Sequence, residues 1–338
     1  MKTAAVDMHC DTISALLEMR RKGTYSAGSG LSSNSLHVDL EKLEKGGYLL
    51  QNFALFVALS ACDDPFRECT ALADLYYEEL EKNKDRIRPV YHYEDIEKNR
   101  AEGKLSALLT VEEGGVCKGR LGNLRLLYRL GVRMLTLTWN FPNELGWPNV
   151  RMREKDSGAA PDFTTPDGEH GLTETGFAFL TEMERLGMIV DVSHLSDAGF
   201  WDVARTANKP FVASHSNARA VCGHVRNLGD DMIRALAEKG GVTGLNFCPS
   251  FLEKERKEGE SRGSLDAIVT HARHIVNMGG EDCLGLGSDF DGIPTNAAIP
   301  DAAHLPHLAD ALKKAGFSER QIDKIFCENV LRVYREIL

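Results

Sequence analysis

Residues 177–194 read FAFLTEMERLGMIVDVSH and contain the pattern that decides the fold. Apolar side chains recur at helical spacing over 177–186, and the run 188–192 that follows is short, apolar and typical of a buried strand. The same alternation of helix-like and strand-like segments continues toward both ends of the chain. It predicts βα units, with a parallel sheet and right-handed crossovers.

Eight strand-like runs are found, and each is followed by a plausible helix. They lie at 4–8, 49–57, 106–111, 133–137, 188–192, 211–213, 241–246 and 283–286. Eight such units favour a closed (β/α)₈ barrel of the TIM type over an open sheet. No Pro/Ser-rich linker divides the 338 residues, so the sequence predicts one catalytic domain over residues 1–338.

One long irregular stretch interrupts this alternation. Residues 139–171 are rich in Pro, Asn, Asp and Gly. A loop of this length inside a compact domain is usually functional or else disordered. Because it follows the fourth predicted strand, it leaves the barrel at the face where barrel enzymes carry their catalytic residues. The stretch is therefore predicted to be an active-site loop.

The composition excludes several classes of partner and site. The net charge is -10, whereas nucleic acids and anionic membranes attract clustered Lys and Arg, so neither is expected as a partner. We find no signal peptide and no run of about 18 apolar residues that would span a membrane. The eight cysteines form no Cys-x-x-Cys pair, which argues against a zinc ribbon. A cytoplasmic protein with reduced thiols is expected.

Residues with metal-binding side chains follow five of the predicted strands. Side chains two apart in a strand point to the same side, so His9 and Asp11 can reach one metal ion together. An isolated His-x-Asp pair is weak evidence, and a single strand-end Asp can equally cap a helix. Catalytic residues of barrel enzymes, however, come from the ends of several strands at one face. The set expected to converge there is His9, Asp11, Glu113, His194, His215 and Asp289.

These residue types also indicate the metal. Imidazole and carboxylate without thiolate suit Zn²⁺, and also Mn²⁺ or Co²⁺. Two ions about 3.5–4 Å apart need a bridging carboxylate, for which Glu113 is the candidate. One ion is then expected on the side of His9 and Asp11, and the other beside the two later histidines. A hydroxide between the ions would be the nucleophile, and Asp289, free of metal, would act as general base and acid.

Several short motifs together resemble the membrane dipeptidase family of zinc peptidases, peptidase family M19. They are HCDT (9–12), EGG (113–115), LTLT (135–138), GLT (171–173), GMIVDVSH (187–194), SHSNA (214–218) and GSDFDG (287–292). The resemblance covers nearly the whole chain. It implies a (β/α)₈ fold, two Zn²⁺ ions per chain, a homodimer, and hydrolysis of dipeptides, including some with a C-terminal D-residue.

The resemblance also assigns roles to single residues. The five expected metal ligands match those of the family, and Asp289 matches its catalytic aspartate. Arg226 matches the arginine that holds the substrate's carboxylate, because a planar guanidinium meets a carboxylate through two parallel hydrogen bonds. Taken alone, Arg226 would be interpreted as a surface ion-pair residue. Asn246, at the end of the seventh strand, is predicted to line the pocket.

One position departs from the family pattern. Mammalian-type dipeptidases have a histidine after the LTLT run, where it helps to stabilise the developing oxyanion; here Trp139 and then Asn140 follow. The indole N–H and the Asn140 amide are both donors, so either is a candidate replacement. Loss of one oxyanion donor can cost roughly 10²–10³ in kcat. The departure therefore bears on efficiency and substrate range, and it leaves the metal site untouched.

Two other interpretations stay open. Other metal-dependent barrel hydrolases act on cyclic amides, nucleobases or phosphotriesters, and many open with His-x-His and use a carboxylated lysine as the bridge. The His-x-Asp opening favours a dipeptidase, with another small amide or lactam as the alternative substrate. A non-catalytic barrel with a decayed site is the second alternative. Outside this set, His271 and His274 lie three apart on a predicted helix without a third ligand, and they are expected to be exposed.

Overall fold

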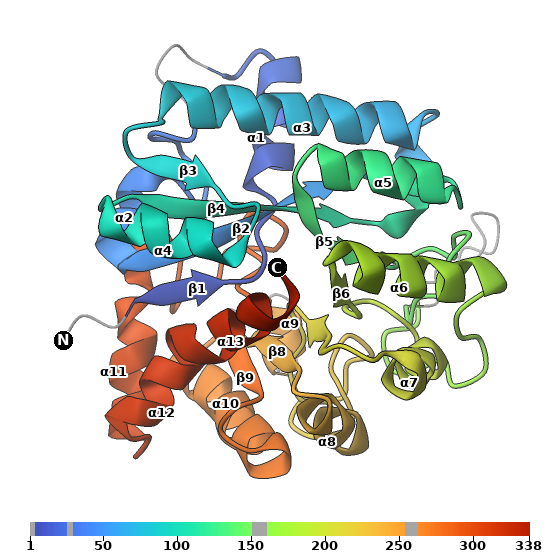
Figure 1. Ribbon diagram of the computed structural model, residues 1–338. Coiled ribbons are helices and arrows are strands. Elements are labelled where there is room, and N and C mark those ends of the chain that lie inside the picture. Colours follow the sequence, from blue (N-terminus) through green and yellow to red (C-terminus); the bar gives the residue numbers. More distant parts are fainter. Residues whose placement is uncertain (1–3, 26–29, 151–160, 254–262) are drawn as a thin grey trace.

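Eight parallel strands form a closed ring at the centre of the molecule (Figure 1). The structure is a computed structural model and describes residues 4–25, 30–150, 161–253 and 263–338. Hydrogen-bonded neighbours follow the order β2-β1-β9-β8-β7-β6-β5-β4, and a further pairing of β2 with β4 closes the ring. The strands of the ring are β1 (Ala5–Asp7), β2 (Tyr48–Phe56), β4 (Leu105–Glu112), β5 (Val132–Thr136), β6 (Ile189–Asp191), β7 (Val212–Ala213), β8 (Val242–Leu245) and β9 (Leu284–Leu286). The predicted barrel is confirmed, and each predicted strand overlaps an observed one.

A ninth strand was not predicted. The segment β3 (Ile87–Pro89) pairs with the first residues of β4, from Leu105 onward, while β5 pairs with β4 from Leu109 onward. Strand β3 is therefore an addition to the edge of β4 and no part of the ring. Its three residues, Ile-Arg-Pro, show too little alternation to signal a strand.

Helices surround the ring of strands (Figure 1). The longer ones are α1 (Thr12–Arg21), α3 (Pro65–Lys82), α5 (Leu121–Arg129), α6 (Glu174–Leu186), α7 (Asp197–Thr206), α8 (Asp230–Glu238), α10 (Leu265–Gly279), α11 (Pro306–Lys314) and α13 (Asn329–Ile337). Shorter or additional ones are α2 (Leu40–Gly46), α4 (Tyr93–Ala101), α9 (Pro249–Leu252) and α12 (Glu319–Asp323). No helix in the described ranges has both the length and the apolar character needed to cross a membrane.

The segment that predicts the fold shows how one βα unit is delimited. Helix α6 begins after Thr173, whose side chain accepts a hydrogen bond from the Gly176 N–H. It ends at Gly187, which adopts the left-handed conformation with φ 76°, a backbone state that glycine reaches at little cost. The chain then enters β6 directly. Cap and turn chemistry thus place the end of β6, and with it His194, at the barrel face that carries the site.

Two apolar cores separate the inside of the barrel from the outside. The larger one lies between strands and helices and includes Ala107, Leu109 and Val111 of β4. The smaller one is the inner core, and it includes Leu108 of β4 and residues of most other strands. It also includes Val330, Val333 and Tyr334 of α13. Helix α13 lies across the ring in Figure 1. The amino-terminal end of the barrel is therefore filled by side chains, which leaves the carboxyl-terminal end for chemistry.

Candidate functional site

Six buried side chains with metal-binding atoms meet where five strands end. Their ligand atoms form three overlapping groups, and within each group all atoms lie within 4.8 Å of one another. The groups are His9–Asp11–Glu112, Glu112–His194–His215 and His9–His215–Asp289. Each residue lies at or shortly after the end of β1, β4, β6, β7 or β9. The predicted convergence of strands at one face is therefore present in the structure.

Glu112 stands between the two sides of this cluster. Its Oε2 atom lies 3.3 Å from Nε2 of His9, and its Oε1 atom lies 2.9 Å from Nε2 of His194. Oε1 is also 3.6 Å from Nε2 of His215. One carboxylate thus faces histidines on both sides, which is the geometry of a bridging ligand.

Glu113, the residue expected in that position, lies outside the cluster, so the prediction was wrong by one residue. Glu112 is the last residue of β4, whereas Glu113 has a φ of 91° and begins a turn. The turn directs its carboxylate away from the histidines, where it accepts hydrogen bonds from the N–H groups of Gly115 and Trp139 and from the Asn143 amide. The carboxyl of Glu113 is a structural group that holds the start of the segment predicted to be an active-site loop, of which residues 151–160 lie outside the described residues.

The alternation of β4 contains the signal that distinguishes the two glutamates. Ala107, Leu109 and Val111 pack between the strand and the helices, so the side chains of the other parity point into the barrel. Leu108 lies in the inner core, and Glu112 has the same parity. Counting parity from the apolar residues, instead of from the EGG motif, would have selected Glu112.

Two imidazole nitrogens in the cluster face each other with their lone pairs. Nδ1 of His194 lies 2.9 Å from Oδ1 of Asn140, and an amide oxygen only accepts, so Nδ1 carries the hydrogen. Nδ1 of His215 lies 2.7 Å from Oγ of Ser214. The two Nε2 atoms are 3.0 Å apart, with Glu112 beside them. Neutral imidazoles and a carboxylate aimed at one point fit a divalent cation.

Burial shifts the pKa values of the cluster in opposite directions. It lowers the pKa of His194 to about 4, with the charge of Arg226 adding to the effect. It raises the pKa of Asp289 to about 7. Burial also acts to raise the pKa of Glu112, but the charge of His9 and the nearby His194 outweigh it and hold that pKa low. For His9 burial acts to lower the pKa, but the charges of Glu112 and Asp11 raise it. A neutral His194 beside an ionised Glu112 is the protonation state in which both can bind a metal, and a bound ion would displace the proton of His9.

The backbone at the cluster is unusually strained. In the described ranges five non-glycine residues have positive φ, and four of them belong to the cluster or lie within two residues of a member: Glu113 (91°), His194 (71°), Asp289 (63°) and Asp291 (68°). Such conformations cost of order 1–3 kcal/mol each and persist where surrounding structure enforces them, commonly at functional sites. The strain therefore supports the same location for the site as the ligand geometry does.

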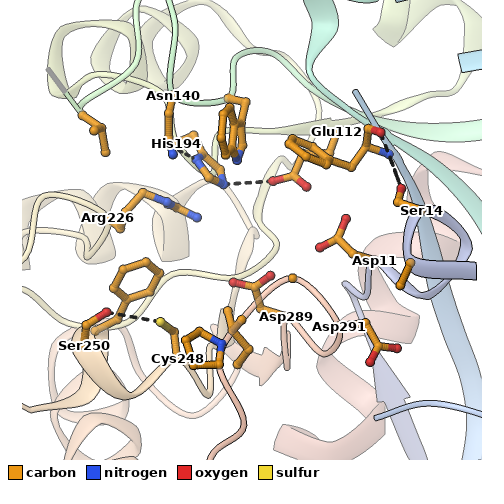
Figure 2. Close-up of a pocket in the computed structure, with 18 of the residues that line it drawn as sticks. Asp11, Ser14, Glu112, Asn140, His194, Arg226, Cys248, Ser250, Asp289 and Asp291 are labelled. Carbon is orange, nitrogen blue, oxygen red and sulfur yellow. Dashed lines mark hydrogen bonds and ion pairs between the residues drawn. The ribbon is translucent and has the colours of Figure 1, made fainter. Parts of the chain in front are cut away.

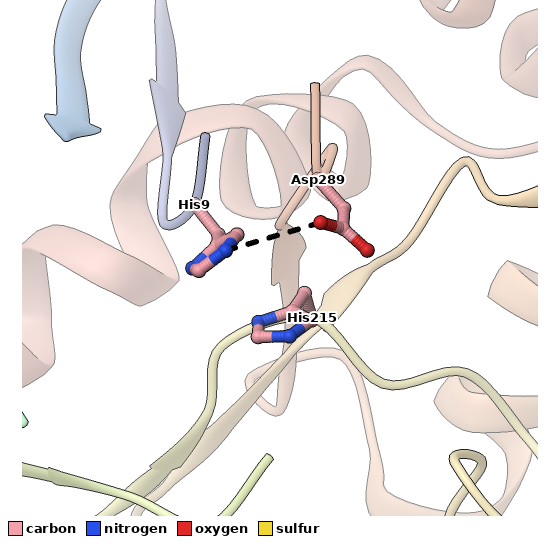
Figure 3. Close-up of side chains that lie close together, drawn as sticks. All are labelled: His9, His215 and Asp289. Carbon is pink, nitrogen blue, oxygen red and sulfur yellow. Dashed lines mark ion pairs between the residues drawn. The ribbon is translucent and has the colours of Figure 1, made fainter. Parts of the chain in front are cut away.

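Asp289 lies near the imidazoles of His9 and His215 (Figure 3). Its Oδ1 atom is 3.9 Å from Nε2 of His9, and its Oδ2 atom accepts a hydrogen bond of 2.8 Å from the Asn246 amide. Asn246 is fully buried and is not among the residues that line the pocket. The expectation that Asn246 lines the pocket is therefore corrected, since this residue holds Asp289 from behind.

Arg226 points into the pocket (Figure 2), and no described residue forms an ion pair with it. Only 4% of its surface is exposed, and its Nε atom has no hydrogen-bond partner among the described residues. The remaining contacts are long, 3.5 Å to Oγ of Ser216 and 3.5 Å to the carbonyl oxygen of His215. A buried charge is costly unless it is paired, so this guanidinium is prepared for an anion from outside the chain.

The cluster opens into a pocket of about 600 Å³. Figure 2 shows Arg226 on one side and Asp11 with Ser14 on the other, with His194 and Asp289 between them. The predicted loop residues Trp139 and Asn140 both line it. The centroids of the Trp139 and Phe56 rings lie 4.9 Å apart, and Oδ1 of Asn140 accepts a hydrogen bond from Nδ1 of His194. The volume suits a small ligand rather than a protein segment.

Comparison with known proteins places the chain among dipeptidases. A family model described as "Membrane dipeptidase (Peptidase family M19)" matches residues 1–338. An uncharacterised dipeptidase of Schizosaccharomyces pombe is 31% identical over 348 residues, which cover 98% of this chain and 80% of the relative. Two solved structures share 28% identity with it. One is the M19 metallopeptidase "dipeptidase AC", with a TM-score of 0.87 over 100% of this chain and 99% of its own. The other, from Rhodobacter sphaeroides, has a TM-score of 0.86 over 100% of both chains and is liganded with a phosphinate mimic of L-Ala-D-Ala.

Proposed function

The chain belongs to the membrane dipeptidase family of metallopeptidases, peptidase family M19, and from this premise we propose that it cleaves dipeptides at a site for two zinc ions. The observation that carries the proposal is the position of Glu112 between histidines on both sides, at 3.3 Å and 2.9 Å. A buried carboxylate in this position can be shared by two metal ions, which favours a two-ion site over a one-ion site.

The residues that would hold the ions divide into two groups that share Glu112. One ion would take His9, Asp11 and Glu112, and the other would take Glu112, His194 and His215. Imidazole and carboxylate ligands suit Zn²⁺, with Mn²⁺ or Co²⁺ as substitutes. When bound, the two ions supply a hydroxide at neutral pH as the nucleophile and polarise the peptide carbonyl.

Asp289 is the proposed proton carrier. The general base of such a hydrolysis takes a proton from the attacking water and returns it to the leaving amine. Burial raises the pKa of Asp289 to about 7, so the side chain exists in both protonation states near neutral pH. The Asn246 amide fixes one carboxylate oxygen and leaves the other directed toward the cluster. These properties suit a group that must accept and donate a proton in one cycle.

Arg226 is the proposed binding residue for the substrate's C-terminal carboxylate. A substrate carboxylate would give the buried guanidinium the partner that it lacks within the described chain. The same contact excludes longer peptides, because an amide at that position carries no charge. The enzyme is thereby restricted to a peptide with one residue after the scissile bond.

The position of Arg226 also sets the direction of the substrate. With the carboxylate at Arg226, the N-terminal residue points toward Asp11 and Ser14 on the opposite side (Figure 2). The wall there is completed by Phe56 and Trp139, whose rings are in contact. We assign Trp139 to this apolar wall, because its ring packs against the Phe56 ring at the edge of the pocket. The N-terminal side chain is therefore expected to be apolar.

The test is hydrolysis of a dipeptide panel with L- and D-residues at the C-terminus, together with cyclic amides. The panel includes L-Ala-D-Ala because the Rhodobacter sphaeroides structure holds a mimic of that dipeptide. Wild type and Asp289→Asn are compared at equal zinc content, and the variant should lose roughly 10²–10⁴ in kcat, the range for a general acid–base group. A zinc-loaded wild type that cleaves cyclic amides and no dipeptide would overturn the proposal in favour of the alternative amide or lactam substrate.

A further inference from the structure

A buried carboxylate lies behind the metal-binding face, where three strands end. Asp191 closes β6 and is completely buried. Its Oδ1 atom accepts hydrogen bonds of 2.9 Å from the backbone N–H groups of Ser193 and Ser214. Its Oδ2 atom accepts from the hydroxyl of Thr136, at 2.7 Å, and from the hydroxyl of Ser214, at 2.5 Å. The carboxylate therefore joins the ends of β5, β6 and β7 without touching the metal cluster itself.

The hydroxyl of Ser214 connects this carboxylate to His215. An ionised carboxylate only accepts, so the hydrogen in the 2.5 Å contact with Asp191 belongs to Ser214. A hydroxyl has one hydrogen, so Oγ must accept in its 2.7 Å contact with Nδ1 of His215. Nδ1 consequently carries the imidazole hydrogen, and the lone pair is on Nε2, 3.6 Å from Glu112.

The other two histidines have weaker support. His194 is held by the amide of Asn140, which belongs to the loop. Neither ring nitrogen of His9 has a hydrogen-bond partner among the described residues. His215 alone of the three is connected, through one hydroxyl, to a carboxylate that is anchored by strand ends.

We propose that Asp191 and Ser214 are positioning residues that fix the tautomer and orientation of His215 as a metal ligand. The inference rests on the proposed function, because it concerns the metal group Glu112–His194–His215. Partners that orient a metal-binding histidine commonly contribute 10–100-fold to metal affinity. The direction of the hydrogen bonds, from His215 to Ser214 to Asp191, is the feature that makes the proposal testable.

Asp191→Asn would reverse that direction with almost no change of shape. Oδ1 accepts from two backbone N–H groups, so the amide oxygen of the variant must occupy that position. The new NH₂ then faces the hydroxyls of Thr136 and Ser214 and donates to them. The hydroxyl of Ser214 becomes free to donate to Nδ1 of His215. The hydrogen of the imidazole would move to Nε2, which removes the lone pair that binds metal.

The first measurement is ¹⁵N NMR of histidine-labelled, metal-free protein, with the His215 signals identified by their loss in His215→Gln. Wild type should show a hydrogen on Nδ1 of His215, and Asp191→Asn should show it on Nε2. The same tautomer in both proteins would overturn the proposal. If Asp191→Asn fails to fold, Ser214→Ala replaces it, and this variant should lose the strict Nδ1 preference; an unchanged spectrum would also overturn the proposal.

The second measurement is zinc affinity by competition with a chelator. Ser214→Ala should weaken binding by about 10–100-fold, and Ser214→Thr, which keeps a hydroxyl, should recover most of it. Ser193→Ala is the matched control for the ring contact, because Ser193 is also fully buried, contacts Oγ of Ser214 and accepts from the backbone N–H of His215, but does not contact the His215 ring. An equal loss in Ser193→Ala would overturn the proposal. A wild type that binds no zinc would refute the proposed function, while the NMR result would still decide the tautomer.

Discussion

The side chains of the metal-binding cluster are supported partly by residues at strand ends and partly by a residue of a loop, and the two kinds of support differ. His215 and Glu112 project from strand ends whose positions are fixed by the barrel, and His215 is supported by a buried carboxylate. Asn140, which supports His194, belongs to the irregular segment that begins after β5 and lines the pocket. Strands thus fix the ligands, while the loop adjusts the pocket around them. Function can therefore change along the loop without loss of the metal site.

The largest effect is expected from Glu112→Gln, compared with Glu113→Gln one residue later. Glu112→Gln removes the ligand that both ions would share. Zinc affinity and kcat should therefore fall by more than the roughly 10–100-fold that is lost when a residue supporting a metal ligand is changed. Glu113→Gln keeps one oxygen to accept from Gly115 and Asn143 and loses the oxygen that accepts from Trp139, so it weakens the turn without removing a group of the cluster. Zinc content should therefore persist in it. Zinc content and dipeptide hydrolysis are measured for both variants. A larger loss in Glu113→Gln than in Glu112→Gln would contradict the assignment of Glu112.

The same comparison explains what the sequence could predict. Strand positions follow from apolar runs, so His9, Asp11, His194, His215 and Asp289 were all placed at the right face. The EGG motif points to Glu113, whereas the parity of β4 favours Glu112. The partnership of Asn140 with His194 could not be predicted, because the path of an irregular loop has no periodicity from which side-chain direction follows.

Histidines outside the motifs show a second limit of sequence patterns. Helical spacing placed His271 and His274 on an exposed face, but His271 is fully buried. Its Nδ1 atom accepts from the Ala218 N–H, and Nε2 donates to the Leu252 carbonyl oxygen. Ala218 lies in the loop that follows β7 and Leu252 is the last residue of α9, so no feature of α10 itself reveals these partners.

The second-largest effect should come from Arg226→Lys, which tests the substrate-binding part of the site. Lysine keeps the charge but loses the two parallel hydrogen bonds to a carboxylate. We expect KM to rise by about 10–100-fold, equivalent to roughly 1.4–2.8 kcal/mol, with a smaller change in kcat. The control is Arg219→Lys, because Arg219 lies in the same segment and is already paired with Asp197 at 2.6 Å and 2.7 Å. Steady-state kinetics should show no rise in KM for the control, and a similar rise in both variants would contradict the assignment.

A smaller effect is expected from Asn140→Ala, which compares loop support with strand support directly. The variant removes one acceptor from Nδ1 of His194, and a single hydrogen bond is worth about 1 kcal/mol, or roughly fivefold in affinity. Chelator competition should therefore show a smaller loss of zinc affinity than Ser214→Ala does. A larger loss in Asn140→Ala would mean that the loop, and not the strands, organises the metal ligands.

The smallest effect on turnover at neutral pH should come from His271→Leu, which instead changes the pH dependence of stability. Burial lowers the pKa of His271 to about 4, below the value near 6.5 of the unfolded chain, so the folded state favours the neutral ring. The stability that His271 contributes through this lowered pKa is complete above pH 6.5 and is lost as the pH falls from 6.5 toward 4. It amounts to about 3 kcal/mol in all. The free energy of unfolding is measured with urea between pH 4.5 and 7.5. That of wild type should fall as the pH is lowered across this window. His271→Leu should be less stable than wild type at pH 7.5 and should lose less as the pH falls. His274→Leu is the control on the same helix, since it leaves His271 and its hydrogen bonds with Ala218 and Leu252 in place. If His271→Leu kept the full pH dependence of wild type, His271 would not be the group whose protonation destabilises the folded state in this window.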